Sequence, residues 1–298
     1  MTFFQLIGDP HYKHKFVLQK IIGHLTGWTR EELIVHYDDE VPVELWDQIN
    51  EKYRLYSEDH EPLEYILWYV EYGWLRFSVN KNTIIPRPET EYMIEAVREY
   101  LTNLTPIPSS LPGEGWPQDS LKKNILVDVG TGSGVLGLSL LHSHGSQIEQ
   151  AFLIDISEGA LAVAKGNYDS LVKNGDIDQN IDVTVAQGNL FDRELIAGGL
   201  IRASQWSIRR DSSTSSEWQH QRKEFIVLAN LPYIPDETFD TNPDLSIKYE
   251  PRVAFVGGDD GLELYRIMFA QIRESGYQTT MFLEMMTWQV DILRQEFE

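Results

Sequence analysis

The chain of 298 residues has no cysteine. This excludes a disulfide framework, a thiolate metal site and catalysis by a cysteine nucleophile. Because disulfides belong mainly to oxidising compartments, a chain without cysteine suits the reducing cytosol, and we expect a cytoplasmic location. The histidines between His11 and His60 have no spacing typical of a metal site, and structural zinc usually takes four N or S ligands, so we expect no bound metal.

Long apolar runs and an excess of positive charge are missing too. No window approaches the roughly 18 consecutive apolar residues that a membrane-spanning helix needs. The first ten residues lack the basic flank and long apolar core of a signal peptide. Asp and Glu number 46 against 25 Lys and Arg, which gives a net charge of −21. Since nucleic acid repels a polyanion, we expect neither a membrane nor free nucleic acid as a direct partner.

A glycine loop stands between an apolar run at 125–129 and an apolar, helix-like stretch at 135–141. Glycines let a ligand approach the main chain closely, and a helix start offers free N–H groups to an anionic group. The next apolar run ends at Asp155, at about the 20-residue separation of a ribose-binding acid. This pattern alone fits a nicotinamide dinucleotide or S-adenosylmethionine. The loop consists of Gly130, Thr131, Gly132, Ser133 and Gly134.

A second motif follows the apolar run 225–229 and consists of Asn230, Leu231, Pro232 and Tyr233. Methylation of a planar NH2 group requires acceptors for both hydrogens, and the Asn230 side chain and the Leu231 carbonyl can supply them. Pro232 fixes the turn, and Tyr233 offers a flat face for an amide or a base. An ordinary turn explains the tetrapeptide alone equally well. Together with the glycine loop, it favours S-adenosylmethionine over nicotinamide.

Strand and helix patterns alternate through the second half of the chain. This predicts an α/β fold with a doubly wound, mostly parallel sheet, whose ligand lies beyond the carboxyl ends of the strands. Gly130, Asp155, Asn189 and Asn230 all follow predicted strands, so we expect them on one rim. The predicted strands are 125–129, 151–154, 181–186, 225–229 and 280–283.

The chain divides into three predicted parts: a helical domain at 1–60, a hairpin connector at 61–84 and the α/β domain at 85–298. Spaced apolar residues between 16 and 56 indicate short helices, and Thr29 with Glu32 forms a possible capping box. We expect the eight tryptophans to pack in the core and the hairpin. Prolines and glycines at 101–123 predict a linker, and 200–223, with its Arg and Ser clusters, predicts an enlarged, solvated crossover.

These motifs, taken together with three others, resemble the HemK/PrmC protein glutamine methyltransferases over nearly the whole chain. The glycine loop and Asn-x-Pro-Tyr occur in many methyltransferases, whereas the first and last of the three others are specific to this family. They are Ile-Pro-Arg-Pro-Glu-Thr-Glu at 85–91, Asp-Ile-Ser at 155–157, and Tyr-Glu-Pro-Arg at 249–252 with Gly-Gly-Asp-Asp-Gly-Leu at 257–262.

The resemblance implies a class I S-adenosylmethionine-dependent methyltransferase fold at 85–298 and a substrate-recognition role for 1–60. The implied reaction is N5-methylation of the glutamine in the Gly-Gly-Gln motif of a peptide chain release factor, by a monomer. The 130–134 loop would approach the methionine part of the cofactor, Asp155 the ribose, and Asn189 with Leu190 the adenine. Asn230 would also contact the cofactor, and together with the Leu231 carbonyl it would hold the substrate amide.

Two positions depart from the family pattern. Leu231 stands where the family usually has Pro, and Asn-Leu-Pro-Tyr is also the form found in ribosomal RNA adenine dimethyltransferases. A nucleic-acid amine methyltransferase is therefore the nearest alternative, followed by an NAD-dependent oxidoreductase and by an inactive scaffold that binds release factors. Asn189 stands where Asp is common and is equally well explained as a turn residue.

The resemblance also implies two further strands after 280–283. A chain that ends at Glu298 would leave the edge of that strand unpaired. From the sequence we therefore expect a C-terminally truncated domain whose methyl-donor site is intact.

Overall fold

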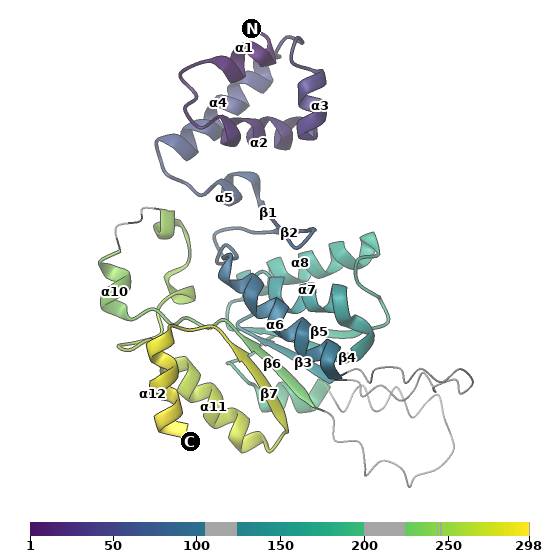
Figure 1. Cartoon of the computed structure of the whole chain (residues 1–298), viewed down its shortest axis with the longest axis vertical. Helices are drawn as coiled ribbons and strands as arrows, with labels where there is room; N and C mark the ends of the chain where they lie inside the picture. Colours follow the sequence, from purple (N-terminus) through teal and green to yellow (C-terminus); the bar gives the residue numbers. More distant parts are fainter. Residues whose placement is uncertain (105–123, 200–223, 243, 245, 298) are drawn as a thin grey trace, which may run out of the picture.

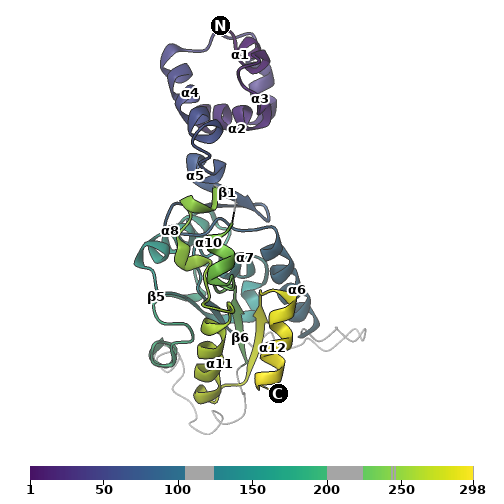
Figure 2. The same ribbon diagram turned by 90° about the vertical axis from the view of Figure 1, so that its left-hand side faces the viewer.

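The computed structural model describes residues 1–104, 124–199, 224–242, 244 and 246–297. It has a lobe of short helices at the N-terminal end and a larger lobe in which helices surround a sheet (Figure 1, Figure 2). A short helix and a hairpin connect the two. In the described residues, no helix has the length and apolar character to cross a membrane.

The N-terminal lobe consists of α1 (Phe3–Gly8), α2 (Lys15–Thr26), α3 (Arg30–Val35) and α4 (Val43–Ser57). The predicted capping box begins α3: the Thr29 hydroxyl accepts the Glu32 N–H at 3.1 Å, and the Glu32 carboxylate accepts the Thr29 N–H at 2.8 Å. The apolar spacing between 16 and 56 correctly predicted α2, α3 and α4, whereas α1 lies before that segment and was not predicted. Their shared core includes Leu18, Ile21, Ile22, Leu33, Ile49 and Tyr53.

The connector contains α5 (Leu63–Leu67) and the antiparallel strands β1 (Tyr69–Tyr72) and β2 (Leu75–Ser78). Leu75 and Phe77 are buried while Arg76 is exposed, which is the alternation expected of a strand, so the predicted hairpin is confirmed. The expectation for the tryptophans is confirmed for Trp28, which packs against the core of the helical lobe, but it is wrong for Trp74, which occupies the tip of the hairpin and is fully exposed. Tip residues have no neighbouring strand to pack against, and Trp68, Trp46 and Trp288 are also exposed. Trp116, Trp206 and Trp218 lie outside the described residues.

The large lobe contains a five-stranded parallel sheet in the order β5-β4-β3-β6-β7. Strands β3 and β6, which lie next to each other inside the sheet, are buried along their whole length, as is typical of parallel strands covered on two faces. The predicted fold class is confirmed, although β4 begins three residues earlier than the apolar run at 151–154. The strands are β3 (Asn124–Val129), β4 (Ile148–Asp155), β5 (Asp182–Gln187), β6 (Phe225–Ala229) and β7 (Thr279–Leu283).

Helices cover both faces of this sheet, because side chains alternate along each strand. Leu126 faces a core that it shares with α6 (Glu89–Leu104), α7 (Val135–His144) and α8 (Glu158–Asn174). Val127 faces the opposite core, with α11 (Glu263–Ser275) and α12 (Thr287–Phe297). Figure 1 shows α11 and α12 together beside β7.

Short elements complete the lobe: the 3-10 turn η2 (Gly145–Gln147) after α7, and α10 (Asp236–Asp240), η3 (Ser246–Tyr249) and η4 (Arg252–Ala254) after β6. Among the described residues, β7 pairs only with β6.

The predicted linker starts too early, because α6 continues to Leu104. Leu101 is completely buried in the core, so packing extends the helix into that segment. The rest of the predicted linker, 105–123, and the predicted crossover at 200–223 with its arginines lie outside the described residues.

Candidate active site

The carboxyl ends of β3, β4 and β6 meet at one edge of the sheet, beside a cavity of about 180 Å³. Ligands of doubly wound sheets bind at this edge. The glycine loop and the Asn-Leu-Pro-Tyr corner both face the cavity. Eight predicted site residues line it: Gly130, Gly132, Asp155, Asn189, Leu190, Asn230, Leu231 and Pro232.

The glycine loop depends on backbone that side chains disfavour. Gly130 and Gly132 have φ of +69° and +55°. A Cβ on Gly130 would lie 3.1 Å from Leu231 Cδ2, so the loop and the corner are in close contact. Asp155 holds the loop in place: Oδ2 accepts the Gly132 N–H and Oδ1 accepts the Ser157 N–H, each at 2.9 Å.

Thr131, Ser133 and Gly134 are not among the residues that line the cavity. The Thr131 hydroxyl donates to Asp128 at 2.6 Å, and the Ser133 carbonyl accepts from Asn167 at 2.8 Å. Gly134, with φ of +83°, precedes α7. In this structure the three residues shape the loop, and their direct contact with a cofactor stays a prediction.

Helix α11 fixes the backbone of the corner. The Leu231 N–H donates to the Tyr265 hydroxyl at 3.2 Å, and this hydroxyl also contacts the carbonyl oxygens of Leu231, at 3.4 Å, and of Glu284. Tyr265 is completely buried, and burial raises the pKa of its hydroxyl, which therefore stays protonated. Sequence reasoning missed Tyr265, because nothing along the chain relates it to the corner.

The start of α6 reaches the same corner. The Asn230 Nδ2 group donates to the Thr90 hydroxyl at 3.4 Å, and Thr90 belongs to the 85–91 motif. With its NH2 group directed to Thr90, Asn230 is left with Oδ1 as a free acceptor. Such an orientation suits a side chain that must accept a hydrogen from a substrate amide.

The 85–91 motif is also bound to the 249–252 motif. The Arg87 guanidinium pairs with Glu250 at 2.5 Å, and the Ile85 N–H donates to the same carboxylate at 2.8 Å. Burial raises the pKa of Glu250, and Arg87 opposes this shift. Since Ile84 and Pro251 line the cavity, this partly buried contact braces its edge.

The glycine motif at 257–262 packs directly on the corner. A Cβ on Gly257 would overlap the Pro232 carbonyl oxygen, and one on Gly261 would overlap the Tyr233 carbonyl oxygen. Gln289 of α12 is completely buried and donates from Nε2 to the carbonyls of Tyr233 and Asp260, each at 2.8 Å. These glycines are needed because two backbone segments touch here.

Comparison with known proteins points to one family. Residues 13–67, which span α2 to α5, match the family model of the PrmC N-terminal domain. A release factor glutamine methyltransferase of Clostridium acetobutylicum is 30% identical over 212 residues, which are 69% of this chain and 55% of that protein. The chain is thus similar in sequence to the release factor glutamine methyltransferases.

Two more members of this group align over a longer part of the chain. The release factor glutamine methyltransferase of Neisseria gonorrhoeae is 27% identical over 270 residues, 90% of this chain and 78% of that protein. The one of Bacillus anthracis is 25% identical over 246 residues, 83% of this chain and 70% of that protein. These matches favour the glutamine methyltransferase interpretation over the nucleic-acid and nicotinamide alternatives.

A buried carboxylate stands beside the corner. Glu284 follows β7, and its Oε1 accepts the Tyr233 hydroxyl at 3.1 Å, while no hydrogen bond reaches its buried Oε2 from the described residues. Burial raises the pKa of Glu284; Tyr233, Asn230 and Thr90 oppose the shift. Burial and Glu284 in turn raise the pKa of Tyr233 to about 12. Tyr233 does not line the cavity.

Sequence reasoning missed Glu284 as a site residue, although the signal was present. It follows the last predicted strand, just as Asn230 follows the fourth, and parallel strands end on one rim. We expect Glu284→Gln to lower the rate of methyl transfer about tenfold, because the Tyr233 hydroxyl then loses a charge-assisted hydrogen bond that holds the corner in place. Single-turnover kinetics and the cofactor dissociation constant measure this; an unchanged rate, or weaker cofactor binding alone, would contradict it.

Asp128 makes stability depend on pH. The side chain is completely buried, and its Oδ2 accepts hydrogen bonds from the Thr131 hydroxyl and, at 3.0 Å, from the Gly137 N–H. Burial raises the pKa of this carboxyl group from 3.8 to about 6. Between these values the folded state holds a proton that the unfolded state has released, so stability falls as pH rises from about 4 to 6.

We expect Asp128→Asn to lose this dependence. When the pH is raised from 4 to 7, the free energy of unfolding of the variant should increase relative to that of the original chain by on the order of 2 kcal/mol. Urea unfolding at the two pH values measures it. A difference that does not change with pH would mean that Asp128 is ionised in the folded state throughout this range.

Proposed function

We propose that the chain transfers a methyl group from S-adenosylmethionine to the side-chain nitrogen of the glutamine in the Gly-Gly-Gln motif of a peptide chain release factor. One observation carries the proposal: Gly132 and Asp155 line the same cavity as Asn230 and Leu231. The relatives, which are named release factor glutamine methyltransferases, support the substrate class.

The cavity suits this cofactor. The absence of a Cβ at Gly130 and Gly132 lets the methionine part approach the loop. Both Asp155 oxygens accept one N–H each, and each carboxylate oxygen can accept a further hydrogen bond, so ribose hydroxyls can be held as well. Asn189 and Leu190, where Leu190 has φ of +60°, would border the adenine.

When bound, the cofactor supplies an activated methyl group on a sulfonium. The chain's own contribution is alignment and exclusion of water. Asn230 Oδ1 and the Leu231 carbonyl accept the two amide hydrogens, Pro232 fixes the turn that follows them, and Tyr233, held by Glu284, completes the corner. The apolar residues Leu264 and Val253 line the cavity beside them.

No strong base is required before transfer, because the sulfonium is already electrophilic and the amide can lose its proton afterwards. The −21 charge and the protein substrate fit a cytoplasmic monomer that contacts a release factor and binds neither membrane nor free nucleic acid. The 1–60 region would recognise the substrate.

Two measurements test the function. Calorimetry should detect binding of S-adenosylmethionine and none of NAD. A labelled methyl donor should then transfer its label to a release factor, and the label should be absent from a factor whose Gly-Gly-Gln glutamine is replaced by alanine. Label in RNA, or cofactor binding without any transfer, would instead support the nucleic-acid enzyme or the inactive scaffold.

A further inference from the structure

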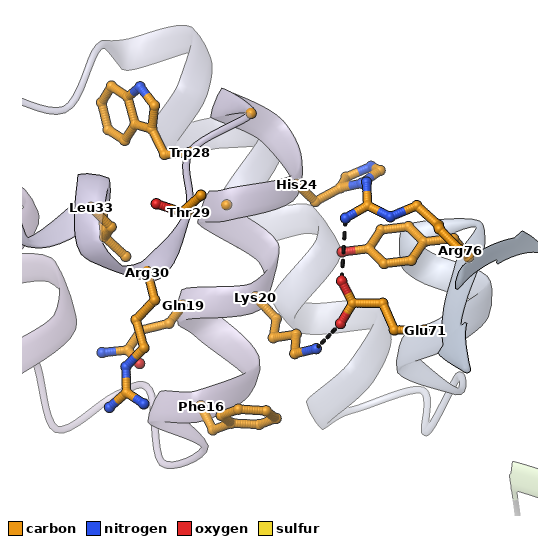
Figure 3. Close-up of a pocket in the computed structure, with 13 residues that line it drawn as sticks. Phe16, Gln19, Lys20, His24, Trp28, Thr29, Arg30, Leu33, Glu71 and Arg76 are labelled. Carbon is orange, nitrogen blue, oxygen red and sulfur yellow. Dashed lines mark hydrogen bonds and ion pairs between the residues drawn. The ribbon is translucent and has the colours of Figure 1, made fainter. Parts of the chain in front are cut away.

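A second cavity, of about 430 Å³, lies between the N-terminal lobe and the connector. Helix α2, the start of α3 and the β1-β2 hairpin form its walls, and we name it the α2–hairpin pocket. None of the catalytic or cofactor residues discussed above lines it. Figure 3 shows Lys20, Glu71 and Arg76 grouped on one side, with Arg30 and Gln19 on the other.

Positive charge exceeds negative charge in this pocket. Lys20, Arg30 and Arg76 line it with a single carboxylate, Glu71. That carboxylate already pairs with Lys20 at 3.2 Å and with Arg76 at 3.3 Å. Arg30 is exposed and forms no ion pair with any described residue. Arg30 is thus available to an incoming anion, and Lys20 and Arg76 add to the positive electrostatic potential of the pocket.

Aromatic rings hold the cations of the pocket in place. The Arg76 guanidinium lies 4.1 Å from the centre of the Tyr69 ring, and the Lys20 ammonium lies 5.5 Å from that of Phe16. Burial, with help from Lys52 and Arg76, lowers the pKa of His24, so this side chain is neutral at pH 7. Phe16 itself is 65% exposed and adds an apolar wall beside the charges.

This combination is unusual for the chain, in which acids outnumber bases 46 to 25. Nucleic-acid sites commonly contact about 6–10 phosphates, which requires more cations than three. A pocket with few cations and an apolar wall instead fits carboxylate side chains flanked by apolar ones.

We propose that the α2–hairpin pocket receives an acidic segment of the protein substrate, on a part of that substrate away from the methylated glutamine. This inference rests on the proposed function. A contact so far from the corner contributes equally to the ground state and the transition state, so it lowers KM and leaves kcat unchanged.

The test is Arg30→Glu, assayed by methyl transfer to a whole release factor. Arg30 is the first residue of α3, where a carboxylate is favourable, so the fold should tolerate the change. Lys13→Glu is the matched control: it makes the same change in charge on an exposed residue of the same lobe that does not line the pocket.

We expect Arg30→Glu to raise KM for the factor about tenfold with kcat unchanged, Lys13→Glu to raise it little, and Arg30→Lys to restore it. Added salt should weaken the difference. Equal KM values for Arg30→Glu and Lys13→Glu would overturn the pocket assignment alone. The same holds if added RNA, by competing with the release factor, removes the difference in KM between Arg30→Glu and the original chain. Absence of methyl transfer by the original chain would instead overturn the proposed function, and the inference with it.

Discussion

Asn230→Ala is expected to abolish methyl transfer almost completely, with a loss of about 10²- to 10³-fold in kcat. The side chain lies at the end of β6 with its NH2 group directed to Thr90, which leaves Oδ1 for the substrate. Alanine removes this acceptor, so the planar amide is no longer held in line with the methyl donor. Cofactor affinity should change far less, because Gly132 and Asp155 are untouched.

Parallel calorimetry and label-transfer assays separate these two effects. Asn103→Ala serves as the control, since Asn103 is exposed near the end of α6 and far along the chain from the motif. A variant at Asn230 that keeps its full rate would show that the corner does not hold the substrate. Equal losses of rate and of cofactor affinity would place Asn230 in cofactor binding instead.

Gly261→Ala should be the most destabilising single substitution near the site. Gly261 has φ of +73°, and a Cβ there would overlap the Tyr233 carbonyl oxygen and lie 2.6 Å from Gln289 Nε2. One contact is a backbone oxygen and the other is the completely buried amide that donates to it at 2.8 Å, so neither group can move aside cheaply. We expect a loss of about 3–5 kcal/mol in the free energy of unfolding and displacement of the corner.

Gly175→Ala is the control that separates the steric clash at Gly261 from the backbone strain that both substitutions cause. Gly175 ends α8 with φ of +83°, but a Cβ there would meet nothing within 4 Å, so only backbone strain of about 1–2 kcal/mol applies. Urea unfolding of both variants measures the difference. If the two lose the same stability, the close packing of the 257–262 segment on the corner is not needed.

Sequence patterns with a local cause could be predicted well. The Thr29 capping box depends on residues three positions apart, and the helix α3 begins where it predicts. The convergence of Gly132, Asp155 and Asn230 follows from one rule, that parallel strands end on the same rim.

Features that depend on tertiary packing could not be predicted. Tyr265 supports Leu231 from 34 positions away, and Leu101 extends α6 because it meets a buried core. The glycines at 257 and 261 could be read as a family motif, but the reason for them, contact with the Pro232 and Tyr233 carbonyls, appears only in three dimensions. The exposure of Trp74 likewise follows from its place at the hairpin tip.

The central claim is that the glycine loop and the Asn-Leu-Pro-Tyr corner bring a methyl donor and a glutamine amide together. The most direct test is mass spectrometry of a release factor incubated with this chain and S-adenosylmethionine, followed by fragmentation of the peptide that contains Gly-Gly-Gln. The account predicts one added methyl group on that glutamine side chain and none with the Asn230→Ala variant. An unmodified glutamine, or a methyl group on another residue, would contradict it.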